Sequence, residues 1–444
     1  MKFRQEEILH QAFYAGLAAA DPQSALPKYL EKIYPEGLTG KCKVVGAGKA
    51  SASMAFALEK FALSHWPLVN LSGLVITRYG HDVQNGTISR KINIVEAAHP
   101  VPDESGLRAT KLMYEEVKEL SPGDQLIVLI SGGGSSLLTL PVDGIDLEQI
   151  QQLTQLLLRC GAPIEEMNIV RKHLSAIQGG NLGRLAARQG ATVNAFIISD
   201  VTGDDPTDIA SGPCAVDPST FQDALEVLKR YQLTEAPNIS QVLKYFNKGI
   251  SGQAPETLKI TDKESKDIHN HVFATPIRSL EAASKYCLEL GFNVEILSDK
   301  IKGEAKEAGI AHAKIALERS TTNLDKPLAI ISGGETTVTM SKDCSGRGGR
   351  CAEFLLSLYQ ETQGLSNLSA LAADTDGIDG SENNAGAFFT QDTRKKANEL
   401  NLDANLFLRE HDAYSFFLQT GSLVNTGPTL TNVNDFRIML INPL

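Results

Sequence analysis

The fold of this chain is decided at residues 126–136, which read LIVLISGGGSS. An apolar run typical of a buried strand ends here in three glycines and two serines. Glycines let consecutive backbone N–H groups approach an anionic oxygen, and a following helix would point its positive N-terminus at the same place. The segment therefore predicts a strand, an anion-binding loop and a helix. A second copy, IISGGETT at residues 330–337, follows about 200 residues later, a spacing typical of two domains.

Short apolar runs alternate with helix-period segments along the whole chain. In the first half the runs are residues 42–45, 73–76, 92–95, 125–130 and 194–198. The alternation is lost between residues 229 and 266 and then resumes at residues 271–274, 293–297, 327–331, 369–373 and 436–441. In the first half, such alternation predicts βα units and a largely parallel sheet covered on both faces, and in the second half it predicts another α/β domain. We therefore expect an α/β fold with two domains, residues 1–245 and 246–444.

The amino-acid composition argues against several classes of protein. The chain has 444 residues, 42% of them hydrophobic, so it can bury large cores. Its 42 basic and 53 acidic residues give a net charge of −11, which argues against nucleic-acid and anionic-membrane partners. Six scattered cysteines without a CxxC pair indicate reduced thiols. With no apolar run near the roughly 20 residues of a membrane span and no secretory signal, we expect a cytoplasmic protein that binds small molecules.

A glycine-bearing turn follows the first expected strand, at residues 46–51 (GAGKAS). Lys43 and Ala50 stand where a Walker A loop needs glycine and Ser or Thr, and Ser51 stands where a dinucleotide fingerprint needs Gly or Ala. Lys49 is the residue of interest, since a lysine between a strand end and a helix N-terminus can neutralise a phosphate or a carboxylate. The alternative is a solvated surface lysine.

Acidic residues gather after the strand at residues 194–198. Asp200, Asp204, Asp205 and Asp208 lie within nine positions. Phosphoryl transfer needs such carboxylates to hold Mg²⁺ and to accept the proton of the attacking hydroxyl. A helix cap followed by a turn is the other interpretation, because Asp is common in both.

The second half carries its own charged turns. Arg350 follows the glycines of residues 346–349 and begins a helical segment. A guanidinium there can bridge a phosphate and a carboxylate, although glycine-rich basic loops are also often only mobile. Residues 374–380, DTDGIDG, match half of a calcium-binding loop but lack its final glutamate, which predicts a carboxylate-bearing active-site turn, metal-linked or not.

Two histidines have weaker signals. His99 lies between strand and helix in the rigid segment HPVP, and without a Ser–His–Asp or Cys–His set we expect a structural or binding role for it. His173 follows Arg171 and Lys172. It either lines an anion site or lies on an exposed helix face.

The order of these motifs is more specific than any one of them. The motifs are residues 45–50, 99–102, 131–136, 168–175, 199–201, 209–213, 332–337, 348–350, 374–380 and 426–429. In this order they resemble glycerate 2-kinases of the MOFRL type, which transfer phosphate from ATP to D-glycerate to give 2-phosphoglycerate. The resemblance implies a Rossmann-like N-terminal domain, a smaller α/β MOFRL domain and an active site in the cleft between them.

The resemblance also assigns roles. Lys49 and Arg350 match the basic residues of the family's active site, and we expect them to neutralise charge on the transferred phosphoryl group. We expect Asp205 to act with them in catalysis and Asp200 and Asp204 to hold Mg²⁺. The residues expected to bind ATP or the acid are Gly46, Gly48, Gly132, Gly133, Gly134, Ser135, Ser136, Gly333, Gly334 and Glu335.

The chain departs from the family pattern at three positions. Cys351 and Ala352 stand where the family has Asn-Gln, and Leu430 stands where it has glycine. Two other functions stay open: an NAD(P)H-dependent hydroxypyruvate reductase, and a non-catalytic sensor of nucleotides or sugar acids. The oligomeric state is open as well, with a homodimer as one option.

Overall fold

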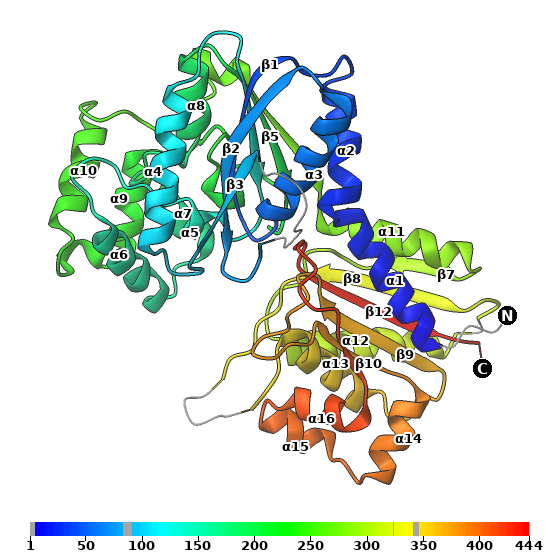
Figure 1. The fold of residues 1–444 in the computed structure, drawn as a ribbon. Helices are drawn as coiled ribbons and strands as arrows, with labels where there is room; N and C mark the ends of the chain where they lie inside the picture. The colour runs from blue at the N-terminus through cyan, green and yellow to red at the C-terminus, as the bar shows by residue number, and fades with distance from the viewer. Residues whose placement is uncertain (1–4, 83–90, 202, 323, 341–345, 444) are drawn as a thin grey trace. The chain divides into compact units, whose positions relative to one another are not determined.

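The computed structural model describes residues 5–82, 91–201, 203–322, 324–340 and 346–443. The chain forms two compact units (Figure 1). The central unit is residues 22–273, and the terminal unit joins residues 1–21 to residues 274–444. Among the described residues, no helix has both the length and the apolar character needed to cross a membrane.

The central unit is built on a six-stranded sheet in the order β3-β2-β1-β4-β5-β6. From β3 to β5 all neighbouring strands pair in parallel, which confirms the prediction from the alternating pattern. The strands are β1 Gly40–Ala47, β2 Val69–Arg78, β3 Ile92–Ala97, β4 Gln125–Ile130, β5 Thr192–Ile198 and β6 Ile268–Ala274. The helices are α2 Pro22–Ile33, α3 Ser51–His65, α4 Glu104–Lys118, α5 Gly134–Leu137, α6 Leu147–Arg159, α7 Ile164–Lys172, α8 Asn181–Arg188, α9 Phe221–Arg230 and α10 Ser240–Ile250.

Apolar clusters stabilise the central unit, and two of them involve the helices on the α4 side of the sheet. The first packs β1, β2, β4 and β5 against α4 and α8, with Val45, Val128 and Met113 at its centre. The second joins α6, α7, α9 and α10 around Phe221 and Phe246, and these helices form the lobe beside α4 in Figure 1. Helix α6 begins with a capping box between residues 146 and 149, which satisfies N–H groups that a helix start leaves open.

The terminal unit contains a second six-stranded sheet, in the order β11-β10-β9-β12-β8-β7. Strand β12, the last in the chain, lies in the centre of this sheet and runs antiparallel to β8 and β9. Helices α1 and α11 cover one face, and α12 and α13 cover the other (Figure 1). The strands are β7 Asn293–Ile296, β8 Leu328–Gly334, β9 Leu368–Asp374, β10 Gly386–Phe389, β11 Leu423–Val424 and β12 Asp435–Ile441. The helices are α1 Gln5–Ala20, α11 Pro276–Glu289, α12 Ala305–Ser320, α13 Arg350–Glu361, α14 Gln391–Glu399, α15 Ala404–Arg409 and α16 Ala413–Thr420.

The two units do not divide the chain at residue 245. Strand β6 extends the first sheet, and its His271 Nε2 lies 2.8 Å from Asn194 Oδ1 on β5, so residues 246–273 belong to the central unit. Conversely, α1 buries Leu9 and Phe13 in the core of the terminal unit. The apolar pattern identifies these elements correctly, but it does not say which core their apolar faces join.

Candidate active site

In the central unit, the loop after β4 is held against the start of α3 by backbone hydrogen bonds. Ser131 N–H donates to Ala47 O at 3.2 Å, and Lys49 N–H donates to Gly132 O at 2.9 Å. Gly48 permits this approach, because its φ is +140° and a Cβ on it would lie 2.1 Å from Ser131 Oγ. Lys49 is therefore fixed next to the glycine-rich loop.

The glycine-rich loop offers backbone donors to a ligand. Within the described part of the chain, the N–H groups of Gly132 and Gly133 donate no hydrogen bond. A Cβ on Gly133 would lie 3.0 Å from the His99 ring and 3.4 Å from Lys49 Cγ. A Cβ on Gly132 would lie 1.7 Å from Asp200 Oδ2. The structure thus places Lys49, His99 and Asp200 beside these N–H groups. The N–H groups and the lysine suit an anionic ligand, whereas the Asp200 carboxylate does not.

A turn with strained backbone conformation packs against this loop. Ala210 and Ser211 have positive φ values of 52° and 56°, which cost about 1–3 kcal/mol each for residues other than glycine. Ser211 Oγ lies 2.9 Å from Ser135 Oγ and 3.1 Å from Asn168 Oδ1, and a Cβ on Gly134 would lie 2.5 Å from Ala210 Cβ. The sequence predicted a turn here but gave no signal for the contact between Ser211 and Ser135.

The acidic segment after β5 places its carboxylates in different environments. Asp200 packs against Gly132, as described. Asp204 Oδ1 is buried and, among the described residues, has no hydrogen-bond partner. Asp205 is exposed, and its Oδ1 accepts the N–H of Thr207 at 2.9 Å, as the alternative interpretation of a turn expected. No three His, Cys, Asp or Glu side chains in the described ranges are grouped as a metal site. The roles of these three aspartates stay predictions.

The turn after β1 has its donors already occupied. The N–H of Gly48 donates to Ile76 O at 3.1 Å, and that of Ala50 donates to Ser131 Oγ at 3.0 Å. Gly46 lies inside β1, where a Cβ would approach Leu129 O to 2.1 Å. These glycines serve close packing, and a binding role for Gly46 or Gly48 stays a prediction.

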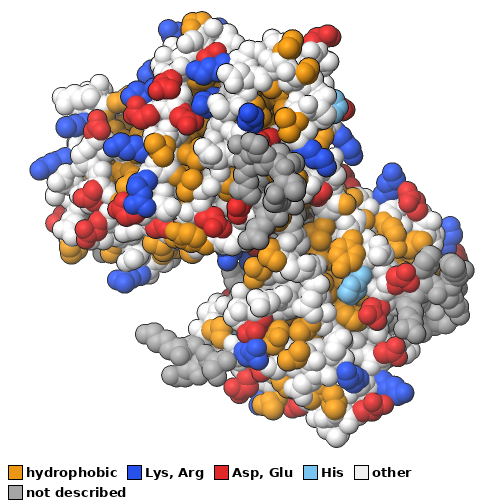
Figure 2. All heavy atoms as spheres, in the orientation of Figure 1, with side chains coloured by type: hydrophobic (Ala, Val, Ile, Leu, Met, Phe, Trp, Pro, Cys, Tyr) orange, Lys and Arg blue, Asp and Glu red, His pale blue; other side chains and the backbone are white. Residues whose placement is uncertain are grey.

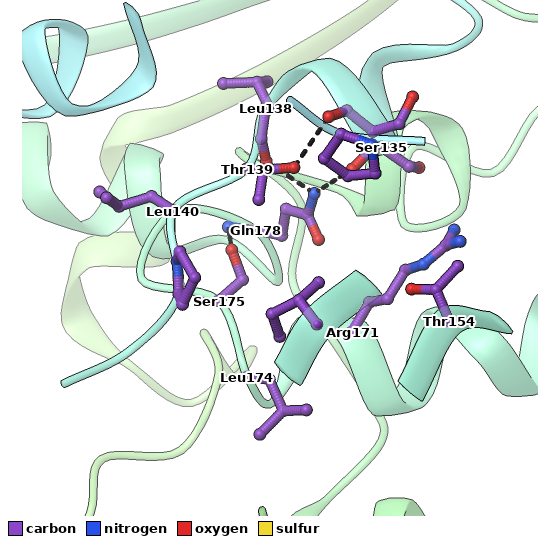
Figure 3. Close-up of a pocket in the computed structure, with 13 residues that line it drawn as sticks. Ser135, Leu138, Thr139, Leu140, Thr154, Arg171, Leu174, Ser175 and Gln178 are labelled. Carbon is purple, nitrogen blue, oxygen red and sulfur yellow. Dashed lines mark hydrogen bonds between the residues drawn. The ribbon is translucent and has the colours of Figure 1, made fainter. Parts of the chain in front are cut away.

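Helix α7 ends in buried rather than exposed polar side chains. Lys172 is 3% exposed, and its Nζ lies 3.5 Å from Asp217 Oδ1. His173 Nε2 lies 3.1 Å from Glu256 Oε2. The alternative that His173 lies on a surface helix face is therefore wrong, because these side chains pack against α9 and the segment before η3 Lys263–Asp267. Arg171, the residue before Lys172, lines a pocket beside the glycine-rich loop (Figure 3).

In the terminal unit, Arg350 begins α13 and meets three carboxylates. Its Nε lies 2.6 Å from Asp435 Oδ1, its Nη2 2.7 Å from Asp374 Oδ2 and its Nη1 3.3 Å from Glu335 Oε1. Burial lowers the pKa of Arg350, but the charges of Asp435 and Asp374 outweigh it and raise the pKa. The Glu335 side chain is 54% exposed, so it is the partner that an incoming anion displaces most easily.

In the turn at residues 374–380, carboxylates interact with groups of the protein itself. Asp379 accepts the N–H groups of Cys351 and Ala352 at 2.9 and 2.8 Å, at the start of α13. Burial raises the pKa of Asp379 to about 7, against the effect of these bonds. Cys351 and Ala352, two of the departures from the family pattern, thus contribute backbone donors to this cap.

The loop after β8 is not a second copy of the loop after β4. Gly333 and Gly334 lie within β8, and the Gly333 N–H already donates to Ser298 O at 2.8 Å. A Cβ on Gly334 would lie 2.3 Å from Ile301 N. Over the described residues 335–340 no helix follows. The expectation of a strand, cradle and helix is wrong here because the glycines admit a neighbouring chain segment instead of an anion, and a binding role for Gly333, Gly334 and Glu335 stays a prediction.

Comparison with known proteins agrees with this geometry. Residues 8–244 match the model of a domain of unknown function (DUF4147), and residues 328–435 match that of the MOFRL family. The chain is 37% identical over 438 residues to glycerate 2-kinase of Pyrococcus horikoshii, which covers 96% of this chain and 95% of that protein. A relative from Agrobacterium vitis, provisionally named a hydroxypyruvate reductase, is 44% identical over 437 residues, covering 98% and 94%.

Solved structures give the same result. The crystal structure of glycerate kinase from Thermotoga maritima superimposes with a TM-score of 0.86 at 35% identity, covering 98% of this chain and 99% of that one. Similarity of this extent spans both units and all the motifs described above. The chain therefore belongs to the MOFRL-type glycerate 2-kinase family.

Proposed function

We propose that this protein is a glycerate 2-kinase, which transfers the γ-phosphoryl group of ATP to the 2-hydroxyl of D-glycerate. The observation that carries the proposal is the loop after β4, where Lys49 and Asp200 lie at the open N–H groups of Gly132 and Gly133. The kinase relatives named above support the choice of substrates.

In this reaction the substrate oxygen attacks the γ-phosphorus, the bond to the bridging oxygen breaks, and ADP leaves. The hydroxyl proton passes to a carboxylate, for which Asp205 is our assignment. Lys49 and Arg350 neutralise the charge that spreads over the transferred phosphoryl oxygens. Catalysis is then mostly positioning and electrostatic stabilisation, since the protein forms no covalent bond.

The residues present fit a magnesium ion. Asp204 Oδ1 is a buried carboxylate oxygen without a partner among the described residues, and carboxylate oxygens are the ligands that Mg²⁺ prefers. Asp200 and Asp204 would hold the ion, which when bound neutralises phosphate charge. One or two carboxylates are enough, because substrate phosphates complete the usual coordination.

The geometry disfavours a hydroxypyruvate reductase. A dinucleotide would place its pyrophosphate on the N–H groups of the turn after β1, but those of Gly48, Lys49 and Ala50 donate to Ile76, Gly132 and Ser131. The turn after β1 therefore lacks the free N–H groups for a pyrophosphate that the name of the Agrobacterium relative would require. We also propose a cytoplasmic location, and for the assembly a homodimer stays one option.

The experiment is a steady-state assay of purified protein with Mg·ATP and D-glycerate, next to one with NADH and hydroxypyruvate. We expect ADP formation that depends on D-glycerate and no oxidation of NADH. The Lys49→Ala variant should lose at least a hundredfold in kcat, whereas Lys118→Ala, an exposed lysine paired with Glu115, should match the wild type. Binding of ATP without turnover would favour the sensor.

A further inference from the structure

A pocket lies next to the glycine-rich loop, inside the central unit. Its cavity volume is about 30 Å³. One water needs roughly 10–15 Å³, so the cavity has room for about two water molecules, which is close to the size of a carboxylate group. Ser135 and Ser136 of the loop line one side, and Thr154 of α6 and Arg171 of α7 line another. Figure 3 shows the Arg171 side chain extending from α7 into the space between this helix and Ser135.

Arg171 carries a positive charge that no described residue balances. Within the described residues its guanidinium makes no hydrogen bond and no ion pair. Burial lowers the pKa of Arg171, and no nearby carboxylate offsets this. Its neighbour Lys172, by contrast, has Asp217 at 3.5 Å. A half-buried cation without a partner destabilises a fold, so its presence points to an anionic ligand.

The other side chains that line the pocket are neutral, with no Asp or Glu among them. Gln178 is 3% exposed and donates to Ser135 O at 2.8 Å and to Leu138 O at 2.9 Å. The wall that carries the loop is thus fixed before any ligand arrives, which lowers the entropic cost of binding.

We propose that this pocket binds the carboxylate of the hydroxy-acid substrate, with Arg171 as its ionic partner. This inference rests on the proposed function. A guanidinium donates two parallel hydrogen bonds to a carboxylate, and hydroxyl-bearing residues of the loop lie at the same pocket. The acid would be held by its charged end, with its hydroxyl groups left for the reaction. Arg171 is then a specificity residue that selects monocarboxylic acids over neutral polyols.

Binding of D-glycerate without nucleotide tests the proposal, measured by calorimetry for the wild type and for Arg171→Leu. Glycerol serves as the neutral probe. The control is Arg159→Leu, at the exposed end of α6. We expect Arg171→Leu to weaken D-glycerate at least thirtyfold, Arg171→Lys to weaken it less, and Arg159→Leu to stay within twofold. The wild type should bind glycerol too weakly to detect.

Thermal unfolding separates binding from a structural role. Removing an unpaired guanidinium should leave the melting temperature of Arg171→Leu equal to or above that of the wild type, while D-glycerate should no longer raise it. In kinetics, the KM for D-glycerate should rise and the KM for ATP should stay within twofold.

Failure of this inference and failure of the proposed function give different results. Phosphorylation of D-glycerate with an unchanged KM in Arg171→Leu would keep the kinase and overturn the pocket. Binding that depends on Arg171 without any phosphorylation would keep the pocket and overturn the kinase. Absence of D-glycerate binding to the wild type at millimolar concentration would overturn the pocket assignment.

Discussion

Arg350 should be a stabilising residue of the terminal unit as well as a catalytic one. The substitution Arg350→Ala removes the cation between Asp374 and Asp435, whose side chains are 6% and 0% exposed. Arg437 stays bound to Asp435 Oδ2 at 2.5 Å, so Asp374 loses its main counter-charge. The variant then holds a buried carboxylate that burial and the charge of Asp376 already disfavour.

The size of the effect follows from the contacts. Removing one partner of a buried ion pair costs about 3–5 kcal/mol, because the other charge stays buried and unpaired. The Arg350 side chain is 26% exposed, so we take the lower end, about 3 kcal/mol. This is a large part of the roughly 5–15 kcal/mol by which a domain is stable.

Urea unfolding followed by circular dichroism measures this free energy. The double variant Arg350→Ala/Asp374→Asn should recover at least half of the loss, since it removes the unpaired charge. Arg347→Ala, which breaks an exposed pair with Glu382 and a cation–π contact with Tyr414, should lose less than about 1 kcal/mol. A loss below about 1 kcal/mol in Arg350→Ala would refute the argument that Arg350 holds these carboxylates. Activity is then best compared in the double variant, which should be folded and still inactive.

Three further predictions concern the loop, a histidine and the metal. Gly132→Ala should push the Asp200 carboxylate away, because the added Cβ would lie 1.7 Å from Oδ2. We expect kcat to fall at least tenfold with little change in melting temperature. A normal kcat would contradict this prediction. Burial lowers the pKa of His312 to about 4 from 6.5, so the native state binds fewer protons, and about 3 kcal/mol of stability present above pH 6.5 should be lost as the pH falls to 4. In His312→Gln, urea unfolding should show a weaker pH dependence; an unchanged one would exclude His312. Asp204→Asn should raise the Mg²⁺ concentration for half-maximal activity at least fivefold, and an unchanged Mg²⁺ titration would remove Asp204 from the metal site.

The sequence predicted most of the strands because their signal is local. The apolar run before Ser131 and the glycines that follow are read directly from neighbouring residues, and they give β4 and its loop correctly. The chain position of β12 carries no such information about its place in the sheet. It pairs with both β8 and β9, and its Phe436 and Ile438 are buried in the core beneath α1 and α11, which is a matter of tertiary packing.

The candidate site was predictable where one residue type has a single strong physical use. The place of Lys49 beside the glycine-rich loop agrees with the structure, and its catalytic role stays a prediction. The structure of the second glycine loop could not be predicted, because glycine permits both the binding of an anion and the close approach of another chain segment. Only the structure shows that Ile301 lies against Gly334. The proposed role of Arg171 could not be predicted for a related reason: its sequence neighbours Lys172 and His173 can also carry a positive charge, and only the partners in the structure distinguish the three residues.

The central claim is tested most directly by ³¹P NMR of the purified protein with Mg·ATP and D-glycerate. We predict loss of the γ-phosphate signal of ATP, formation of ADP, and one new monoester resonance that matches 2-phosphoglycerate. Formation of 3-phosphoglycerate would contradict the assigned position, and intact ATP with D-glycerate present would contradict the kinase itself.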